Sequence, residues 1–416
     1  ASVLGALPAS VISALMGIKT AYQGYQAYDY LEAGVDISTL EMCQGDRRVE
    51  ESLIPLSPEQ EARVLELARS NIFISMHEHP VLFPERIGED IFEYNREGKQ
   101  RCAYEALSRG YFDVIFDNLM DGTCNIMSPG GWKWDEILFD IGMRACDLAH
   151  QEFAFQCRSV EDIHRAHREG KLGLVFTLEG AAPIENEVDR IDILYGLGVR
   201  SMGITYSETN ALGSGMKEEK DGGLTLFGKR CVERMNQVGM LIDCSHAGRQ
   251  TTLDTIEYSA KPIVLSHVGA KHLWDSRRLV TDEVLLACAQ KGGVIGIEAA
   301  PHTTITRDHP LHTVESVMEH FEYVRNLVGI DHVSFGPDTL YGDHVGLHNA
   351  YARKLSLKTV QGEGFPRVEY VKGMENPTEA SKNILRYLVK AGYSDEDIQK
   401  VMSGNMLRVL EEVWGR

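Results

Sequence analysis

Two histidines spaced one residue apart are the first feature of this sequence that could do metal chemistry. His77 and His79 come directly after a short apolar run, residues 71–76. In a β-strand, residues i and i+2 point to the same side, so both imidazoles could reach one ion. A lone His-x-His pair is more often two unrelated packing or surface histidines. The metal interpretation therefore depends on the rest of the chain.

Four more candidate ligands follow other short runs of β-branched residues. They are Glu179, His246, His267 and Asp338. With the His-x-His pair they make four imidazoles and two carboxylates, which is the inventory of a two-metal hydrolytic centre. Two divalent cations in such a centre lower the pKa of a water between them and polarise a substrate carbonyl. Asp338 could take the proton from that water and return it to a leaving amine.

These side chains converge only if the runs that precede them are parallel strands of one sheet. Short β-branched runs alternate along the chain with longer amphipathic stretches, which is typical of parallel strands joined by right-handed helical crossovers. The predicted strands are residues 71–76, 112–116, 173–178, 200–205, 240–244, 262–266, 293–297 and 332–335. The predicted helices include residues 59–70, 160–170, 226–238, 281–291 and 313–328.

Eight such units predict an α/β fold of the (β/α)8 TIM-barrel type, in which the carboxyl ends of all strands face one active site. An open, doubly wound sheet is the alternative. That fold usually has a glycine-rich phosphate loop after an early strand, and neither G-x-G-x-x-G nor G-x-x-x-x-G-K occurs here. We therefore expect the barrel.

Composition predicts a soluble globular protein, with 43% hydrophobic and 25% charged residues in 416. The formal net charge of −19 disfavours nucleic acid as a partner, because an acidic surface repels phosphate backbones. The eight cysteines form no C-x-x-C pair, which argues against a zinc ribbon or a thioredoxin-like motif. Their scatter favours reduced thiols in a reducing compartment, so we expect a cytoplasmic protein.

The first 60 residues are predicted to be an N-terminal extension, and residues 61–416 the catalytic barrel domain. Ser57 and Pro58 carry the signature of a helix start, which places the beginning of the domain near residue 60. Residues 3–18 are apolar but shorter than the about 20 residues that a membrane-spanning helix needs. We expect no stable membrane span, and three roles remain open for this segment: a packing helix, a subunit contact or a peripheral membrane anchor.

Several longer stretches resemble one enzyme family. From about residue 70 to the C-terminus, the chain resembles the membrane (renal) dipeptidase family of the amidohydrolase superfamily. The matching stretches, in order, are residues 159–171, Phe176-Thr-Leu-Glu-Gly180, residues 194–200, Gly223-Leu-Thr-Leu-Phe-Gly228, residues 238–246, Pro262-Ile-Val-Leu-Ser-His267, residues 329–338 and Gly404-Asn-Met-Leu-Arg-Val409.

This resemblance implies a barrel that binds two divalent ions, expected to be Zn²⁺, with Glu179 bridging them and His246 and His267 on the second ion. It implies the proton-handling role for Asp338 and a homo-oligomer, a dimer or larger. It also implies that Arg278 binds a substrate carboxylate, since a guanidinium can give two parallel hydrogen bonds to one carboxylate. The neighbouring Arg277 is an equally good chemical candidate.

Three positions depart from the family pattern. The first strand carries His77-Glu-His79 where the family has His-x-Asp, which removes one negative charge. Tyr206 stands where the family has a histidine after the fourth strand, and its phenol could hold a developing oxyanion. Glu298 adds an acid that could pair with a substrate amine, bind metal or pair with Arg278. Trp132, Trp134 and the loop 343–348 are candidate lid elements.

Together these observations predict a metal-dependent hydrolase that cleaves an amide bond in a small carboxylate-bearing substrate, such as a dipeptide. Two alternatives stay open. One keeps the metal site but hydrolyses a non-peptide amide or a lactone, or decarboxylates its substrate. The other is a non-catalytic metal-binding or scaffold protein that kept the barrel and lost activity.

Overall fold

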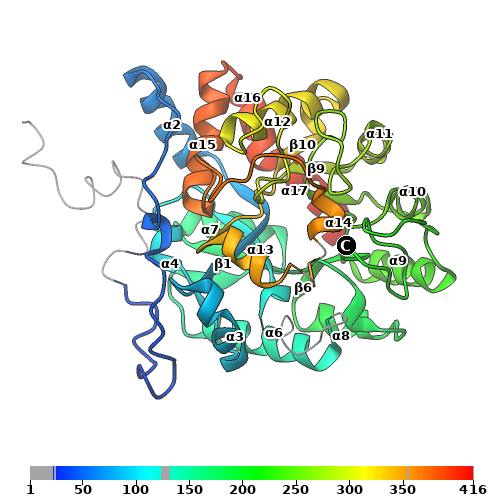
Figure 1. Cartoon of the computed structure of the whole chain (residues 1–416), viewed down its shortest axis with the longest axis horizontal. Coiled ribbons are helices and arrows are strands. Elements are labelled where there is room, and N and C mark those ends of the chain that lie inside the picture. The colour runs from blue at the N-terminus through cyan, green and yellow to red at the C-terminus, as the bar shows by residue number, and fades with distance from the viewer. Residues whose placement is uncertain (1–21, 23–24, 123–131, 353, 356, 416) are drawn as a thin grey trace, which may run out of the picture.

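The computed structural model describes residues 22, 25–122, 132–352, 354–355 and 357–415. At its centre lies a curled, mostly parallel β-sheet with helices around its outside (Figure 1). The strands are β1 (Ile74–Leu82), β2 (Arg101–Cys102), β3 (Val114–Asn118), β4 (Ala154–Gln156), β5 (Leu172–Leu178), β6 (Val199–Gly203), β7 (Leu241–Asp243), β8 (Val264–Val268), β9 (Val294–Ile297), β10 (Val333–Phe335) and β11 (Leu340–Tyr341).

The order of the sheet is β10-β9-β8-β7-β6-β5-β3-β1-β11, so neighbours in the sheet follow the chain almost in sequence. β2 pairs antiparallel with β1, and β4 pairs parallel with β5. All eight predicted strands are present, and the ladder pairs between them are parallel. The alternation of short β-branched runs with amphipathic stretches thus predicted the strands and their direction correctly.

The two ends of the sheet lie side by side. β10 pairs with β9 and β11 pairs with β1, and only residues 336–339 separate β10 from β11. In this short link the Asp338 N–H donates to the His77 carbonyl at 3.1 Å, and the His79 N–H donates to the Thr339 carbonyl at 3.0 Å. The carboxyl ends of the first and last strands are therefore next to each other.

The helices are α2 (Pro58–Ser70), α3 (Ile87–Glu97), α4 (Tyr104–Ser108), α6 (Trp134–Ala149), α7 (Val160–Glu169), α8 (Arg190–Gly196), α9 (Leu226–Val238), α10 (Arg249–Tyr258), α11 (Asp282–Gln290), α12 (Val314–Val328), α13 (His344–Ala350), α14 (Leu357–Gln361), α15 (Pro377–Lys390), α16 (Asp395–Gln399) and α17 (Asn405–Trp414). Short single turns are η3 (Gly45–Arg47), η4 (Leu119–Asp121), η5 (Ala182–Ile184), η6 (Ile330–His332) and η7 (Lys400–Gly404). The predicted helices end within one residue of the observed ones. Ser57 caps α2 through a capping box with Gln60, as its sequence signature predicts.

The C-terminal helix α17 covers the end of the sheet opposite to the strands' carboxyl ends. Its apolar residues recur with helical spacing and pack against the first residues of several strands. This cluster includes Met406, Val409, Leu410 and Val413 from α17, and Ile74, Val114, Leu241, Val264 and Val294 from the strand starts. Because this end is filled with apolar side chains, the carboxyl ends are left to form a polar site.

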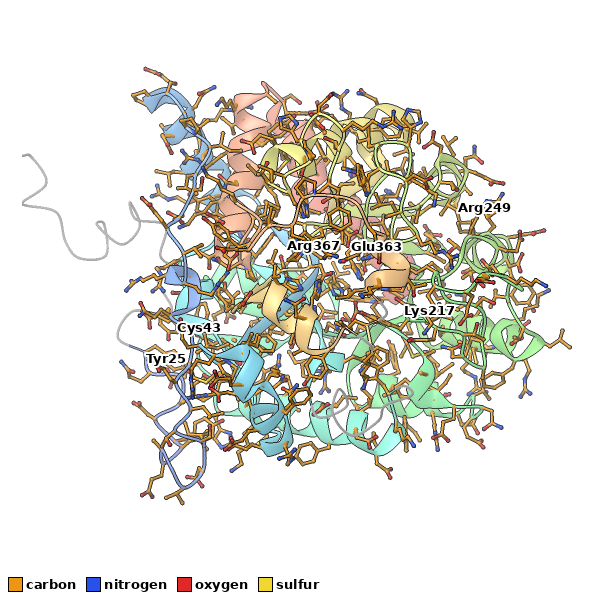
Figure 2. All side chains as sticks on the ribbon, viewed as in Figure 1. Tyr25, Cys43, Lys217, Arg249, Glu363 and Arg367 are labelled. Atoms are coloured by element: carbon orange, nitrogen blue, oxygen red, sulfur yellow. The ribbon has the colours of Figure 1, made fainter. Side chains whose placement is uncertain are left out.

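The N-terminal extension lies along one side of the domain, where Figure 2 labels Tyr25 and Cys43. Polar contacts hold it there: the Tyr28 hydroxyl donates to Asp147 at 3.2 Å, and Arg48 lies 2.5 Å from Glu375. The apolar segment 3–18 lies outside the described residues, so its three possible roles stay predictions. The seven cysteines of the described ranges are free, and six of them are buried. In the same ranges, every helix is too short or too polar to cross a bilayer.

Two local predictions were wrong. The first strand does not end at residue 76 but continues to Leu82, because its outer half pairs with both β2 and β11. His77 and His79 are therefore inside the strand. Residues 343–348 are also not a loop: Asp343 caps the helix α13 by accepting a hydrogen bond from Gly346 N–H.

Candidate metal centre

The six predicted site residues meet near the carboxyl ends of the strands. His77 and His79 lie on β1, and His267 lies on β8. Glu179 follows β5, His246 follows β7, and Asp338 lies between β10 and β11. Two groups of three residues place one ligand atom each within 4.8 Å of one another: His77 with Glu179 and His267, and His77 with His79 and Asp338.

The first group is arranged around one carboxylate oxygen. Glu179 Oε1 lies 3.1 Å from His246 Nε2, 3.2 Å from His267 Nε2 and 3.5 Å from His77 Nε2. Gly203 at the end of β6 makes this position possible. A Cβ on Gly203 would lie 2.0 Å from the carbonyl oxygen of Glu179, so any other residue would push the strand ends apart.

The second group is arranged around Asp338. Its Oδ1 lies 3.0 Å from His79 Nε2 and 3.5 Å from His77 Nε2. Asp338 has φ 57°, a left-handed conformation that is uncommon for a residue with a Cβ. Strained backbone of this kind persists only where the surrounding structure holds it, and here the Asp338 N–H is tied to the His77 carbonyl.

The hydrogen bonds of His267 show which of its two ring nitrogens carries the proton. Ser266 Oγ lies 2.5 Å from Asp243 Oδ2 and 2.7 Å from His267 Nδ1. Because the single hydroxyl proton of Ser266 goes to the Asp243 carboxylate, the oxygen accepts a proton from His267 Nδ1–H. Nε2 of His267 is then an unprotonated acceptor that faces a carboxylate oxygen at 3.2 Å. Two acceptors at this distance are stabilised by a cation beside them, or by the Nε2–H of His246, which lies 3.0 Å from His267 Nε2 and 3.1 Å from Glu179 Oε1.

His77 supports the same conclusion. Its Nε2 is buried and makes no hydrogen bond to the described residues, although it faces both Glu179 and Asp338. A buried nitrogen without a partner costs free energy unless an ion or a water completes it. Histidine nitrogens and carboxylate oxygens are the donors that zinc and similar divalent ions accept. The residues present therefore fit a metal centre.

Asn118, at the end of β3, contacts this centre through Glu179 and was missed by the sequence analysis. Its Nδ2 donates to Glu179 Oε2 at 2.6 Å. It also lines the pocket above the ligands. Partners of this kind orient a ligating carboxylate and tune its basicity. The rule that identified the other ligands applies to Asn118 too, because it comes two residues after a predicted strand.

The charges of the site follow from burial and mutual contact. Burial by itself raises the pKa of Glu179, but His246, His267 and His77 around it hold the pKa well below 4.5. Burial likewise acts to raise the pKa of Asp338, and His77 and His79 hold it well below 3.8. Burial lowers the pKa of His267 to about 3. At neutral pH the site thus presents two carboxylates and the neutral imidazole of His267, which are protonation states that bind metal.

Tyr206 lies over the centre. Its ring stacks on His246 with centroids 4.2 Å apart, and the indole of Trp132 meets it edge-on at 4.7 Å. Burial, with the nearby Glu179 and Asp338 charges, raises the pKa of Tyr206 well above 10. The phenol therefore keeps its proton and can donate it in a hydrogen bond. Trp132 is part of the pocket wall, whereas Trp134 begins α6.

Arg278 and Glu298 form a buried ion pair. Of the three partners considered for Glu298, a substrate amine, a metal ion or Arg278, the structure shows Arg278. Arg278 Nη2 lies 2.6 Å from Glu298 Oε2, and both side chains are at most 5% exposed. Arg278 also donates to the carbonyls of His267 at 2.8 Å and Ser245 at 3.3 Å. Arg277 is exposed and donates to the Lys217 carbonyl at 2.5 Å, so Arg278 is the arginine of this pocket.

Helix α13 forms the outer wall of the pocket, in front of β1 in Figure 1. Its apolar side packs on α3 through Leu347 and Ala350. His344 and His348, one turn apart, line the pocket, and their ring centroids are 4.4 Å apart. Nδ1 of His348 is buried and has no hydrogen-bond partner among the described residues. Their i, i+4 spacing is a signal that the sequence analysis left unused.

The segment that follows α14 lies next to this wall. Figure 2 labels Glu363 and Arg367 near the middle of the view, on the same side as α13 and α14. The backbone N–H of Val368 donates to His302 Nε2 at 2.9 Å, which ties this segment to the rim after β9. The space between these walls, including the part that is open to solvent, is about 680 Å³.

Comparison with known proteins places these residues in a family context. Residues 138–354 match the membrane dipeptidase family (peptidase family M19). Dipeptidase tcpJ of Claviceps purpurea (strain 20.1) is 29% identical over 255 residues, which are 61% of this chain and 54% of that protein. The chain thus spans about half the length of this curated relative.

Two solved structures have a similar fold. An amidohydrolase from Pseudomonas aeruginosa superposes with a TM-score of 0.69 at 26% identity, over 85% of this chain and 99% of that one. A metallopeptidase from Rhodobacter sphaeroides, solved with a phosphinate mimic of the dipeptide L-Ala-D-Ala, superposes with a TM-score of 0.63 at 20% identity. It covers 83% of this chain and 100% of its own.

Proposed function

Because this chain belongs to the membrane dipeptidase family, peptidase family M19, we propose that it is a metal-dependent dipeptidase that hydrolyses the amide bond of a small dipeptide-like substrate. The convergence of the His77, His246 and His267 imidazoles on Glu179 Oε1, where a pocket opens onto the strand ends, is the observation that carries this proposal. Cations bound there would also satisfy the buried His77 Nε2, which makes no hydrogen bond to the described residues.

We also infer that the curled sheet is a closed (β/α)8 barrel of the amidohydrolase type. The link from β10 to β11, with its hydrogen bonds to β1, supports this inference. In such barrels the active site lies at the carboxyl ends of the strands, where all six ligands lie.

Two divalent ions, proposed to be Zn²⁺, would be held by His77, His79, Glu179, His246 and His267, with the Asp338 carboxylate beside them. When bound, the ions would supply an activated water at neutral pH and polarise the carbonyl of the scissile amide. The imidazole of His79 in place of a carboxylate makes this centre one charge more positive than a His-x-Asp centre would be.

The protein's own residues would handle the proton and the developing charge. Asp338 is ionised and lies at the edge of the pocket, so its carboxylate can accept a proton and pass it to the leaving amine. The Tyr206 hydroxyl keeps its proton and can donate a hydrogen bond to the oxyanion that forms from the carbonyl. Trp132 and α13 limit the access of bulk water to these groups.

The test is metal content by elemental analysis on protein purified without chelator, combined with a hydrolysis assay on L,L- and L,D-dipeptides. L-Ala-D-Ala is the natural first substrate, because its mimic binds the Rhodobacter sphaeroides metallopeptidase. About two ions per chain with dipeptide turnover would support the proposal. Metal without dipeptide turnover would favour another amide, a lactone or a decarboxylation, and protein without metal would refute the mechanism.

Two variants assign the roles in the same assay. Asp338→Asn is expected to retain metal and to lower kcat by about 10²-fold or more, since the proton acceptor is lost. His246→Ala is expected to lose metal together with activity. Normal turnover by the asparagine variant would remove Asp338 from the mechanism.

A further inference from the structure

We propose that Glu298 determines the specificity of this pocket, because it occupies the edge of Arg278 that a substrate carboxylate would need. The site would then favour a substrate whose C-terminal group is a neutral hydrogen-bond acceptor, such as a carboxamide, over one with a free carboxylate. This inference rests on the proposed amide-hydrolase function and narrows its substrate class.

The position of the pair defines its role. Arg278 lines the pocket, whereas the Glu298 side chain is 0% exposed and lies behind it. Glu298 follows β9, and its N–H donates to the Val268 carbonyl at 3.1 Å, so its backbone is fixed by the sheet. With its backbone fixed and its side chain buried, the carboxylate lies 2.6 Å from Arg278 Nη2. A substrate would therefore meet Arg278 with Glu298 already in place.

The donors of Arg278 are mostly taken by the protein. Nη2 donates to the His267 carbonyl at 2.8 Å and lies 2.6 Å from Glu298 Oε2, and Nη1 donates to the Ser245 carbonyl at 3.3 Å. A guanidinium binds a carboxylate with two parallel N–H groups, either Nη1 with Nη2 or Nε with Nη2. Both pairs include Nη2, which already donates to the His267 carbonyl and lies beside the Glu298 carboxylate.

Charge works in the same direction. A substrate carboxylate placed at Nη2 would share one guanidinium edge with Glu298. Burial already raises the pKa of Glu298 to about 8, against the opposing effect of Arg278, and a second like charge in a buried site would repel it, so an acid could bind there only with Glu298 protonated. If the substrate instead drew Arg278 away, Glu298 would lose its ion-pair partner in a buried position, which is costly. Neither Glu298 oxygen makes a hydrogen bond to the described residues, so the positive charge of Arg278 is the partner that this carboxylate would lose.

A neutral group avoids both costs. The remaining Nη1 and Nε hydrogens of Arg278 point in different directions, so each can give one hydrogen bond to a carbonyl oxygen. A C-terminal carboxamide or ester needs only one such bond and brings no negative charge near Glu298. Arg278 and Glu298 would therefore bind a neutral C-terminal group and would not favour a free carboxylate over it.

The experiment compares L-Ala-D-Ala with its C-terminal amide in wild-type protein and in Glu298→Gln, at saturating metal and with metal content measured. We expect the ratio of kcat/KM for the acid to kcat/KM for the amide to rise at least tenfold in Glu298→Gln. Glu375→Gln is the matched control, because Glu375 is also a buried carboxylate 2.5 Å from an arginine, Arg48, but lies outside the pocket. Its ratio should stay within twofold of wild type.

A binding measurement keeps the inference testable if the glutamine variant does not fold. Calorimetric titration of metal-loaded wild-type protein with N-acetyl-D-alanine and with its amide should show tighter binding of the amide. Equal or tighter binding of the acid, or an unchanged ratio in Glu298→Gln, would overturn the inference while leaving the dipeptidase proposal intact. Absence of turnover for both substrates would instead refute the proposed function, and the binding preference would still decide the role of Glu298.

Discussion

Asn118→Ala tests whether the support behind Glu179 matters for metal binding. The Asn118 amide donates to Glu179 Oε2 at 2.6 Å, and the Asn118 side chain is 1% exposed. Alanine removes the donor and leaves a charged oxygen without its partner at a buried place. The carboxylate then holds its position and its charge less well, so the ions that it would bind should be held more weakly.

The expected loss can be estimated from this one hydrogen bond. A hydrogen bond to a charged group contributes about 1.5–3 kcal/mol. Since 1.4 kcal/mol corresponds to a factor of ten, metal affinity should fall about 10- to 100-fold. Substitution of residues that orient metal ligands has effects of about this size in other metalloenzymes.

The assay is the apparent metal Kd, obtained by competition with a chelator of known affinity at constant pH. Asn405→Ala serves as the matched control, because the Asn405 amide is equally buried and donates to the carbonyls of Ile330 at 2.7 Å and Val333 at 2.9 Å. It lies far from the metal centre, next to η7. We expect Asn405→Ala to lower the free energy of unfolding without changing metal affinity.

A metal Kd in Asn118→Ala within twofold of wild type would refute the reasoning. It would mean that the position of Glu179 does not depend on this amide. An equal loss of affinity in Asn405→Ala would refute it in another way, because the effect would then come from general destabilisation.

Two further histidines can be tested in the same way. His348→Ala removes from the pocket wall a buried Nδ1 that has no hydrogen-bond partner among the described residues. We expect KM to rise about fivefold in steady-state kinetics, with metal content unchanged by elemental analysis. An unchanged KM would exclude His348 from substrate binding. His320 accepts from Ala270 N–H at 3.0 Å and lies 3.1 Å from the Ile305 carbonyl, and burial lowers its pKa from 6.5 to about 4. The unfolded chain takes up this proton below about pH 6.5 and the folded protein only below about pH 4, so the contribution of His320 to stability is complete above pH 6.5 and is lost as pH falls to 4. Over this window, His320→Gln should reduce the fall in the unfolding free energy of the metal-free protein by about 3 kcal/mol, and an unchanged pH dependence in urea titrations would contradict this.

The sequence by itself determined the strands, the helices and the ligand types. β-Branched runs and amphipathic stretches are local patterns with different periods, so they predict where elements begin and end without knowledge of the fold. The parallel arrangement then follows from their alternation, and the carboxyl ends of parallel strands lie on one side of the sheet. This is why the positions of Glu179, His246, His267 and Asp338 directly after predicted strands were enough to select them as ligands.

Only the tertiary structure decided how these residues are grouped and what surrounds them. His77 lies between the carboxylates of Glu179 and Asp338. This position depends on the curl of the sheet, which brings β1 next to the link after β10. The contact between Arg278 and Glu298 joins segments that follow β8 and β9, and no local pattern specifies that distance. The left-handed backbone of Asp338 is likewise held by a hydrogen bond to a strand more than 250 positions away. Local patterns encode the period of each element, whereas distances of a few ångströms between elements arise only from packing and register.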